Sequence, residues 1–287
     1  MIPFLSVSPA SLYMAGTFGR SIALIKTSLS VLKQDRELLL FPVLSAIATI
    51  ILVASFIVPI FVSGLLMQAA SSWVLQVVLL AIFYFITFSV AIFFNTGIIA
   101  CADIRLRGGD PTVRDGLSVA WANIGRILSW ALVAATVGLV LRLAAERSGL
   151  LGKIAIAIVG GVWSLATLFV IPVMVFEQKG VADAIGESWR LFKGTWGENV
   201  IGNGGLGLLV LPGILLFVLA FASLVLGNIV LTAGLFVLAI IGTAVLGVVY
   251  GSLHGIFVTA LYRYAKDGTV SPAFGDDLVR NAFVAKR

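Results

Sequence analysis

Charged residues are scarce in this chain. Only 11% of its 287 residues are charged, whereas 60% are hydrophobic, and the mean hydropathy is +1.13. A water-soluble domain needs a larger charged fraction to cover its surface, so this composition indicates that a lipid bilayer is the main solvent. No stretch between the apolar runs is long enough to fold alone. We therefore expect a single membrane domain over residues 1–287.

Residues that commonly carry chemistry are also few. Cys101 is the only cysteine and cannot form an internal disulfide, and His254 is the only histidine. No Cys/His grouping has metal-ligand spacing, and no nucleotide-binding, metalloprotease or serine-hydrolase motif is present. The sequence thus predicts no cofactor, no metal and no catalytic residue. Residues 1–20 lack a basic region followed by a clean apolar run, so they do not resemble a cleaved signal peptide.

Six uncharged apolar runs are distributed along the chain, at residues 38–66, 73–102, 127–141, 154–176, 206–226 and 229–262. A helix needs about 20 apolar residues to cross ~30 Å of hydrocarbon. The third run is shorter, and we expect Ile124 and Ala144–Ala145 to complete it, with Arg142 reaching the interface. The predicted fold class is an all-α integral membrane protein with six transmembrane helices, arranged as three antiparallel hairpins.

Basic residues indicate the orientation of these helices. If the N-terminus is inside, all 19 lysines and arginines except Arg142, Arg147 and Lys153 fall on the inner side. Cytoplasmic loops carry such an excess, so both termini are predicted to be cytoplasmic. This bias also explains the net charge of +6, and we expect no nucleic-acid partner.

The inner links have a mixed polar and apolar character. Residues 19–36 place Ile22, Ile25, Leu29 and Leu32 on one helical face, and residues 113–126 and 181–196 are similarly mixed, with Trp121, Trp189 and Trp196 as interfacial anchors. These patterns predict amphipathic helices on the cytoplasmic leaflet, one before each hairpin.

The order of surface helix, span, outer turn and span would then occur three times, over residues 19–102, 111–176 and 181–265. Two short matches favour this internal repeat. Asp115-x5-Trp121 recurs as Asp183-x5-Trp189. Gly97-x4-Ala102-x2-Arg105 recurs as Gly255-x4-Ala260-x2-Arg263.

Two ionisable residues are candidates for a function within the membrane. Glu177 ends the fourth run and could be a proton or cation site, but we favour an interfacial carboxylate paired with Lys179 or Arg190. His254 lies about two turns inside the sixth run and could relay protons. A hydrogen bond to a neighbouring helix is the more common role for such a residue, and we favour it.

Small residues form the most specific packing signal. Thr243, Gly247, Gly251, Gly255 and Thr259 recur at a spacing of four and form one helix stripe, where another helix backbone could approach. The stripe does not distinguish an internal contact from a dimer or pore. Residues 194–207 hold six glycines, which fit either a flexible entry to the fifth run, the reading we favour, or a transporter site.

The segment from Pro172 to Trp196 contains an acid (Glu177) at the end of a span, then Gly180, then Ser188-Trp189-Arg190-Leu191. It resembles a broad group of uncharacterised prokaryotic six-span proteins, which includes the membrane domain fused to some glycerophosphodiester phosphodiesterases. The resemblance covers about 25 residues and departs from the pattern at Gln178 and Lys179. It implies architecture and a prokaryotic cell (inner) membrane location, and it implies no activity.

Three functions remain open on the sequence alone. A non-catalytic module that binds or organises membrane lipids or proteins is favoured by the predicted surface helices, whose basic residues would contact anionic headgroups. Its other partners would be a second protein or another copy of the chain. The alternative is a channel or transporter for a small solute, although charge within the spans is scarce. An intramembrane enzyme ranks last.

Overall fold

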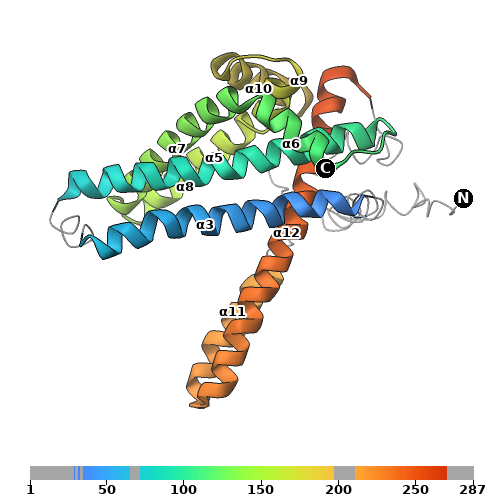
Figure 1. The fold of residues 1–287 in the computed structure, drawn as a ribbon. Helices are drawn as coiled ribbons and strands as arrows, with labels where there is room; N and C mark the ends of the chain where they lie inside the picture. The colour runs from blue at the N-terminus through green and yellow to red at the C-terminus, as the bar shows by residue number, and fades with distance from the viewer. Residues whose placement is uncertain (1–28, 30–31, 33–34, 65–71, 197–210, 270–287) are drawn as a thin grey trace, which may run out of the picture.

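The chain folds into helices in the computed structural model, which describes residues 29, 32, 35–64, 72–196 and 211–269 (Figure 1). No strand occurs in these ranges, so the all-helical prediction is confirmed. The helices are η1 (Arg36–Leu39), α3 (Leu40–Val62), α5 (Trp73–Leu106), α6 (Val113–Ala122), α7 (Ile124–Glu146), α8 (Leu150–Ala166), α9 (Val170–Phe176), α10 (Val181–Trp196), α11 (Leu211–Ala222), η3 (Ser223–Leu226) and α12 (Ile229–Asp267).

Five helical segments are long and apolar enough to cross a membrane: Glu37–Val62, Trp73–Leu106, Ile124–Glu146, Leu150–Phe176 and Ile229–Asp267. The sequence predicted six spans, and the one that is missing from these five is the fifth apolar run, 206–226. It forms α11 and the short η3, whose apolar part Pro212–Val225 is shorter than a span, and residues 206–210 lie outside the described ranges. The described part of the chain therefore shows five helices of spanning length and one shorter apolar helix.

The boundary between α6 and α7 differs from the predicted surface helix at 113–126. A break at Asn123 ends α6, and α7 begins at Ile124. Arg126 thus belongs to the first turn of an apolar helix. With Ile124 and Ala144–Ala145 included, α7 has 23 residues, so the run that looked too short forms a helix of spanning length.

The fourth run is interrupted. Helix α8 ends at Ala166 and α9 starts at Val170, whereas the sequence suggested one continuous span. Pro172 explains the break, because its ring nitrogen has no hydrogen to donate to the carbonyl of Leu168 and its ring disfavours a continuous helix. The turn places Phe169 in the core, where it is fully buried.

Helices α3, α5, α7 and α8 form the main bundle, whereas α11 and the N-terminal part of α12 project away from it as a pair (Figure 1). The C-terminal part of α12 returns to the bundle and packs against α3, α5 and α10. Most of the core lies there, and Leu253, Ile256 and Leu261 of α12 are fully buried. The assignment of these helices to three transmembrane hairpins stays a prediction.

Two glycines mark close contacts at this junction. A Cβ atom on Gly97 would lie 2.4 Å from Cε1 of Phe41 in α3. A Cβ atom on Gly255 would similarly lie near Ile98 of α5. These are equivalent positions in the short sequence match between α5 and α12, and in both cases only glycine allows the observed approach.

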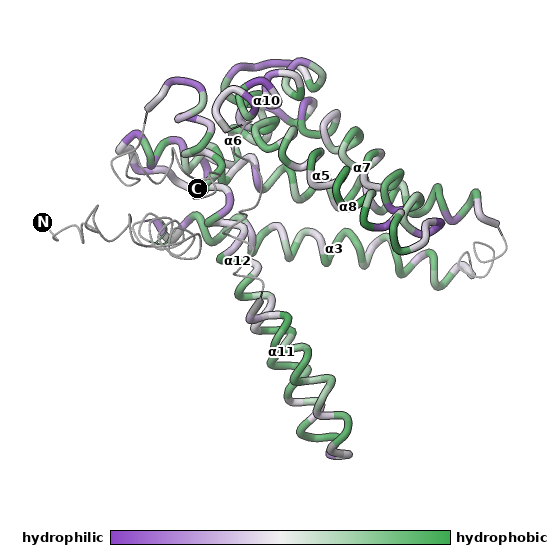
Figure 2. Tube along the Cα trace, turned by 180° about the vertical axis from the view of Figure 1, so that it is seen from behind, coloured by the Kyte–Doolittle hydropathy of each residue, from purple (hydrophilic) through white to green (hydrophobic). Residues whose placement is uncertain are grey.

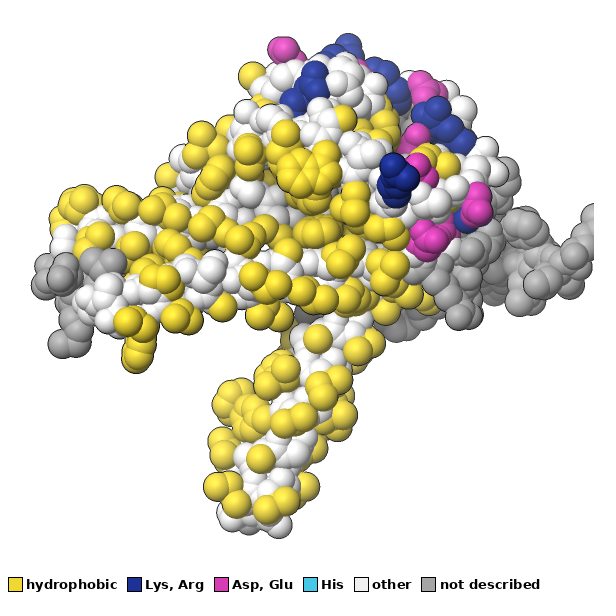
Figure 3. Space-filling model, viewed as in Figure 1, with side chains coloured by type: hydrophobic (Ala, Val, Ile, Leu, Met, Phe, Trp, Pro, Cys, Tyr) yellow, Lys and Arg dark blue, Asp and Glu magenta, His cyan; other side chains and the backbone are white. Residues whose placement is uncertain are grey.

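The surface is apolar over most of its area. Hydrophobic residues cover the bundle and the projecting pair, and hydrophilic residues concentrate near α6 and α10 (Figure 2). On the face shown in Figure 3, Lys, Arg, Asp and Glu side chains gather over one end of the bundle. A soluble protein rarely exposes so large an apolar surface, so these helices are compatible with a membrane protein.

Candidate functional site

The charged end of the bundle brings together the start of α3, the ends of α5, α9 and α12, and helices α6 and α10. Its first cluster, the Glu177–Glu187 cluster, forms where α9, α10 and α12 meet. Glu177 accepts a hydrogen bond from Tyr262 Oη at 2.9 Å and pairs with Lys179 Nζ at 2.8 Å and Lys266 Nζ at 3.0 Å. Glu187 is buried and pairs with Lys179 at 3.2 Å and with Arg190 at 2.6 Å.

The sharp turn between α9 and α10 makes this cluster possible. Gln178 adopts a left-handed backbone conformation with φ of 55°, which is uncommon for a residue with a side chain. Arg126 of α7 holds it there, because the guanidinium donates to Gln178 Oε1 at 2.7 Å and to its carbonyl oxygen at 3.0 Å. Gln178 and Lys179 therefore both have structural roles.

The two carboxyls of the cluster are ionised near neutral pH. Burial alone raises the pKa of Glu177, but hydrogen bonds from Lys179, Lys266 and Tyr262 together outweigh it and hold the pKa below its ordinary value. The bond from Arg190 lowers the pKa of Glu187. A general acid or a proton carrier needs a carboxyl pKa closer to the working pH, so both groups are better suited to holding helices together.

A second cluster joins α5 to α12. Asp103 of α5 is buried and pairs with Arg263 of α12, whose Nε lies 2.5 Å from Oδ1. The carboxylate also pairs with Arg107 at 2.9 Å. Because Asp103 and Arg263 are both largely shielded from water, removal of either partner would leave an uncompensated charge.

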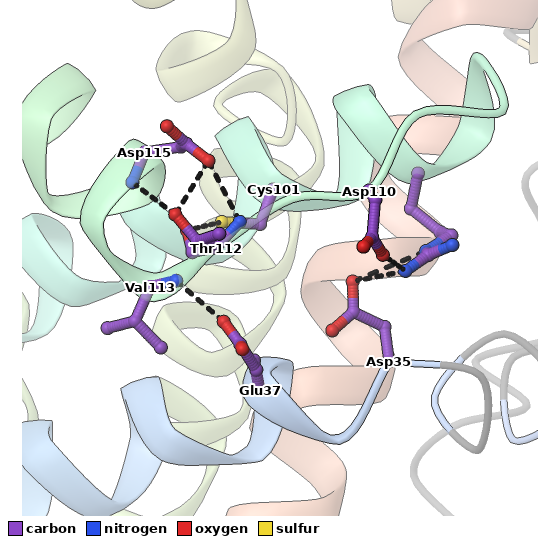
Figure 4. Close-up of polar contacts among 8 residues, drawn as sticks. Asp35, Glu37, Cys101, Asp110, Thr112, Val113 and Asp115 are labelled. Atoms are coloured by element: carbon purple, nitrogen blue, oxygen red, sulfur yellow. Dashed lines mark hydrogen bonds and ion pairs between the residues drawn. The ribbon is translucent and has the colours of Figure 1, made fainter.

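A third cluster lies between the start of α3 and the link from α5 to α6 (Figure 4). Arg105 lies between Asp35 and Asp110, at 3.2 Å and 2.5 Å. The carboxylate of Glu37 accepts a hydrogen bond from the backbone N–H of Val113 at 2.8 Å, at the N-terminus of α6. Thr112 and Asp115 complete a capping box at the same helix end. The start of α3 is thereby tied to α6.

Ser188 and Trp189 have opposite surroundings on α10. The hydroxyl oxygen of Ser188 is buried and accepts a hydrogen bond from the backbone N–H of Phe169 at 2.9 Å. It thus satisfies a donor that the break between α8 and α9 leaves free. Trp189, by contrast, is 43% exposed and stacks on Phe192. One face of α10 therefore packs on the bundle, while the other is available for contacts.

His254 lies away from the charged clusters, at the junction of α3, α5 and α12. Its ring stacks on Tyr250 at a centroid distance of 5.8 Å. Of the stripe glycines on the same helix, Gly255 contacts α5 and Gly251 contacts Pro42 of α3, whereas a Cβ atom on Gly247 would meet no atom within 4 Å. The structure therefore does not bring His254 and Glu177 together.

The sequence analysis did not identify several residues of the charged end. Glu187, Tyr262 and Lys266 were not singled out, and Asp103 was not recognised as the partner of Arg263. One signal was present in the match between α5 and α12. Its two equivalent arginines, Arg105 and Arg263, each pair with a buried aspartate of a neighbouring element. The threefold repeat itself stays a prediction.

Among the residues that the structure describes, no group of three or more His, Cys, Asp or Glu side chains could hold a metal ion. The ionic clusters are paired internally. This end of the bundle presents exposed charged side chains of both signs and the exposed rings of Trp121 and Trp189, next to a large apolar surface.

Over the residues that the structure describes, the fold and this site define an all-helical protein with five apolar helical segments of membrane-spanning length. The chain belongs to the Family of unknown function (DUF6159), which matches residues 74–272. No curated protein and no solved structure matches it. The comparisons show no link to glycerophosphodiester phosphodiesterases, so the resemblance of the segment from Pro172 to Trp196 is not supported by them.

Proposed function

We propose that this chain is a six-span protein of the prokaryotic cell membrane, and that it acts as a non-catalytic module which binds lipid headgroups or proteins at its cytoplasmic side. In this proposal α11, completed by residues before Leu211, is the fifth span. The charged end and both termini are cytoplasmic, and only the links on that side form surface helices.

The observation that carries the proposal is the internal neutralisation of the buried and half-buried carboxylates. Asp35, Asp103, Glu177 and Glu187 all have basic partners within 3.3 Å. Arg114 and Lys193 are exposed and form no ion pair with a described residue. The exposed rings of Trp121 and Trp189 lie on the same two helices, α6 and α10. Aromatic and basic residues in this combination favour the headgroup layer.

The distribution of charge along the chain indicates that the strongest contact with anionic lipid is made by another segment of the cytoplasmic side. Nine acidic and ten basic residues lie in the described part of the charged end, so this part carries little net charge. The net charge of +6 therefore depends on other segments, among which residues 19–36 hold Arg20, Lys26, Lys33 and Arg36. Each basic residue near an anionic surface contributes ~1 kcal/mol to binding. We propose that this segment supplies the main attraction for anionic lipids.

Transport of a small solute is less well supported. Ile256, Val258 and Leu261 are buried apolar residues between His254 and the charged end. Dense apolar packing there favours a binding or organising role over conduction.

Reconstitution can test the proposal. The thermal stability of the purified chain should rise when phosphatidylglycerol replaces phosphatidylcholine in the vesicles. Replacement of Lys26, Lys33 and Arg36 by glutamine should abolish this rise, whereas the matched triple change at Arg142, Arg147 and Lys153 should preserve it. Equal loss in both variants would contradict the proposed side of contact. Proton flux across the vesicle membrane can be measured in the same preparations. A flux that is abolished by Glu177→Gln and also by His254→Ala would contradict the non-catalytic, non-transporting role.

A further inference from the structure

A cavity of about 230 Å³ lies where α3, α5 and α12 meet. Its polar lining consists of Ser45 from α3, Asn95 from α5 and His254 from α12, and its aromatic lining includes Phe94 and Tyr250. These three helices come together in Figure 1 at the point where α12 leaves the bundle. The cavity is separate from the charged clusters described above.

The packing of α12 explains why a cavity forms here. Close contacts fix α12 on the side nearer the charged end, through Gly255 against Ile98 and through Ser252, whose hydroxyl donates to the carbonyl of Leu38 at 3.0 Å. That carbonyl lacks its usual helical donor because the residue four positions later is Pro42. The cavity lies beside these contacts, because Tyr250, Gly251 and His254 on the same turns of α12 line it.

The polar groups of the lining have no partners within the described part of the chain. Neither Ser45, Asn95 nor His254 forms a side-chain hydrogen bond there, although His254 stacks on Tyr250. Other polar side chains of the same helices are satisfied: Ser89, Thr96 and Thr259 each donate to a backbone carbonyl four residues earlier. An unsatisfied polar group in an apolar environment costs ~1–3 kcal/mol. Three such groups around one cavity indicate a site for a polar ligand.

The lining also defines the chemistry of that ligand. It contains no Lys, Arg, Asp or Glu, so it offers no counter-charge for an ion. Asn95, His254 and Ser45 offer both donors and acceptors, which suit hydroxyl and carbonyl groups. The volume corresponds to nearly eight molecules of water at ~30 Å³ each, enough for a small polar head. The lining includes Ala91, which is exposed on the apolar surface, so an apolar tail could extend outward there.

We propose that this cavity binds the uncharged head of a bilayer lipid that carries hydroxyl and ester groups, such as a monoacylglycerol. The head hydrogen-bonds to Asn95, His254 and Ser45, and the acyl chain leaves past Ala91 into the membrane. This proposal rests on the membrane location proposed above, but not on contact with anionic lipid at the charged end.

Photocrosslinking in nanodiscs tests this proposal. The full chain is placed in phosphatidylcholine nanodiscs with a trace of a diazirine-bearing monoacylglycerol, and labelled peptides are identified by mass spectrometry. Labelling should fall on the α3, α5 and α12 peptides that line the cavity. Excess monoolein should compete, whereas hexadecane, which has no polar head, and glycerol, which has no tail, should not. Competition by glycerol alone would show a water-soluble occupant and overturn the proposal.

Substitutions separate a ligand site from ordinary packing. Asn95→Leu and His254→Phe should each weaken monoolein competition by about tenfold, the effect of losing one hydrogen bond of ~1.4 kcal/mol. Without added lipid, both variants should unfold at or above the wild-type temperature, because an unsatisfied polar group has been replaced by an apolar one. Ser89→Ala, on the same helix as Asn95, should change neither property.

Two outcomes would contradict the assignment. Unchanged competition in both variants would show that the polar groups hold no ligand, and clear destabilisation of either variant without lipid would show that these groups are bonded within the protein. Replacement of Lys26, Lys33 and Arg36 by glutamine should leave the competition by monoolein unchanged. Failure of anionic-lipid binding alone would then affect the proposed function and not the cavity.

Discussion

The hydroxyl oxygen of Ser188 accepts a hydrogen bond from the backbone N–H of Phe169 at 2.9 Å, and the two residues lie on either side of the α8–α10 corner. This bond ties α10 to the point at which the fourth apolar run breaks. The serine of the Ser-Trp-Arg-Leu segment therefore has a structural explanation in the geometry of that break. It stabilises a turn that Pro172 imposes.

Replacement of this serine should destabilise the corner. Ser188→Ala leaves the buried Phe169 N–H without an acceptor, so we expect a loss of about 1–3 kcal/mol in the free energy of unfolding. Thermal or chemical unfolding in mild detergent measures it. Ser164→Ala is a matched control, because that exposed hydroxyl bonds only to Gly160 within its own helix. Equal effects of the two substitutions would argue against the role of Ser188.

The small-residue stripe of α12 should divide into sensitive and tolerant positions. Gly255→Ala forces its new methyl group against Ile98 at the contact with α5, and overpacking of this kind typically costs ~1–3 kcal/mol. Gly247→Ala meets no atom within 4 Å and should be neutral or slightly stabilising. The unfolding temperatures of the two variants give the comparison. If Gly255→Ala were as stable as Gly247→Ala, the close approach of α12 to α5 would be wrong.

The contact between α5 and α12 should depend on the second ionic cluster. Asp103→Asn leaves the guanidinium of Arg263 without its carboxylate in a largely buried site. Loss of one partner costs ~3–5 kcal/mol for a fully buried pair, and we expect somewhat less here because Arg263 is partly exposed. Unfolding in detergent of this variant is compared with that of Glu146→Gln. The latter removes the exposed pair with Arg142 and should cost no more than ~1 kcal/mol. Similar costs for both would contradict a clamping role for Asp103.

Acid should weaken the Glu177–Glu187 cluster. Both carboxyls have a pKa below the ordinary value of 4.5 in the folded protein. Their contribution is therefore fully present above the unfolded pKa and is lost as the pH falls through the folded pKa. We expect the Glu177→Gln, Glu187→Gln variant to be less stable than the wild type at pH 7, and the difference to shrink below about pH 4.5. A difference that stayed constant with pH would show that ionised carboxylates do not stabilise the fold.

The helices were largely predictable from the sequence, and their contacts were not. The mixed polar and apolar pattern placed a helix at Val181–Trp196, with the same bounds as the observed α10. The extension of the third run by Ile124 and Ala144–Ala145 followed from length alone. The break before Val170 was missed, because the hydropathy stays high through it. Pro172 was the one sequence signal of the break.

The ionic clusters depend on distances between helices that local sequence does not encode. Asp103 and Arg263 lie on different helices, far apart along the chain, yet form one ion pair. Glu177 was expected to pair with Lys179 or Arg190; it pairs with Lys179, two positions away, whereas Arg190 pairs with Glu187. Its other partner, Lys266, comes from α12 and required the tertiary structure. The polar cavity at His254 likewise combines residues of α3, α5 and α12, which no motif records.

The central claim is that the charged end of a membrane-spanning bundle faces the cytoplasm, and cysteine labelling in intact cells tests it most directly. Single cysteines replace Arg114 and Lys193 at the charged end and Arg147 at the opposite end. Arg114 and Lys193 are exposed and belong to none of the ionic clusters. The native Cys101 is 2% exposed and should add little background. A membrane-impermeant maleimide applied from outside should label the cysteine at Arg147 and leave those at Arg114 and Lys193 unlabelled until the cells are opened. Labelling of the cysteine that replaces Arg114 or Lys193 from outside would contradict a cytoplasmic location of the charged end.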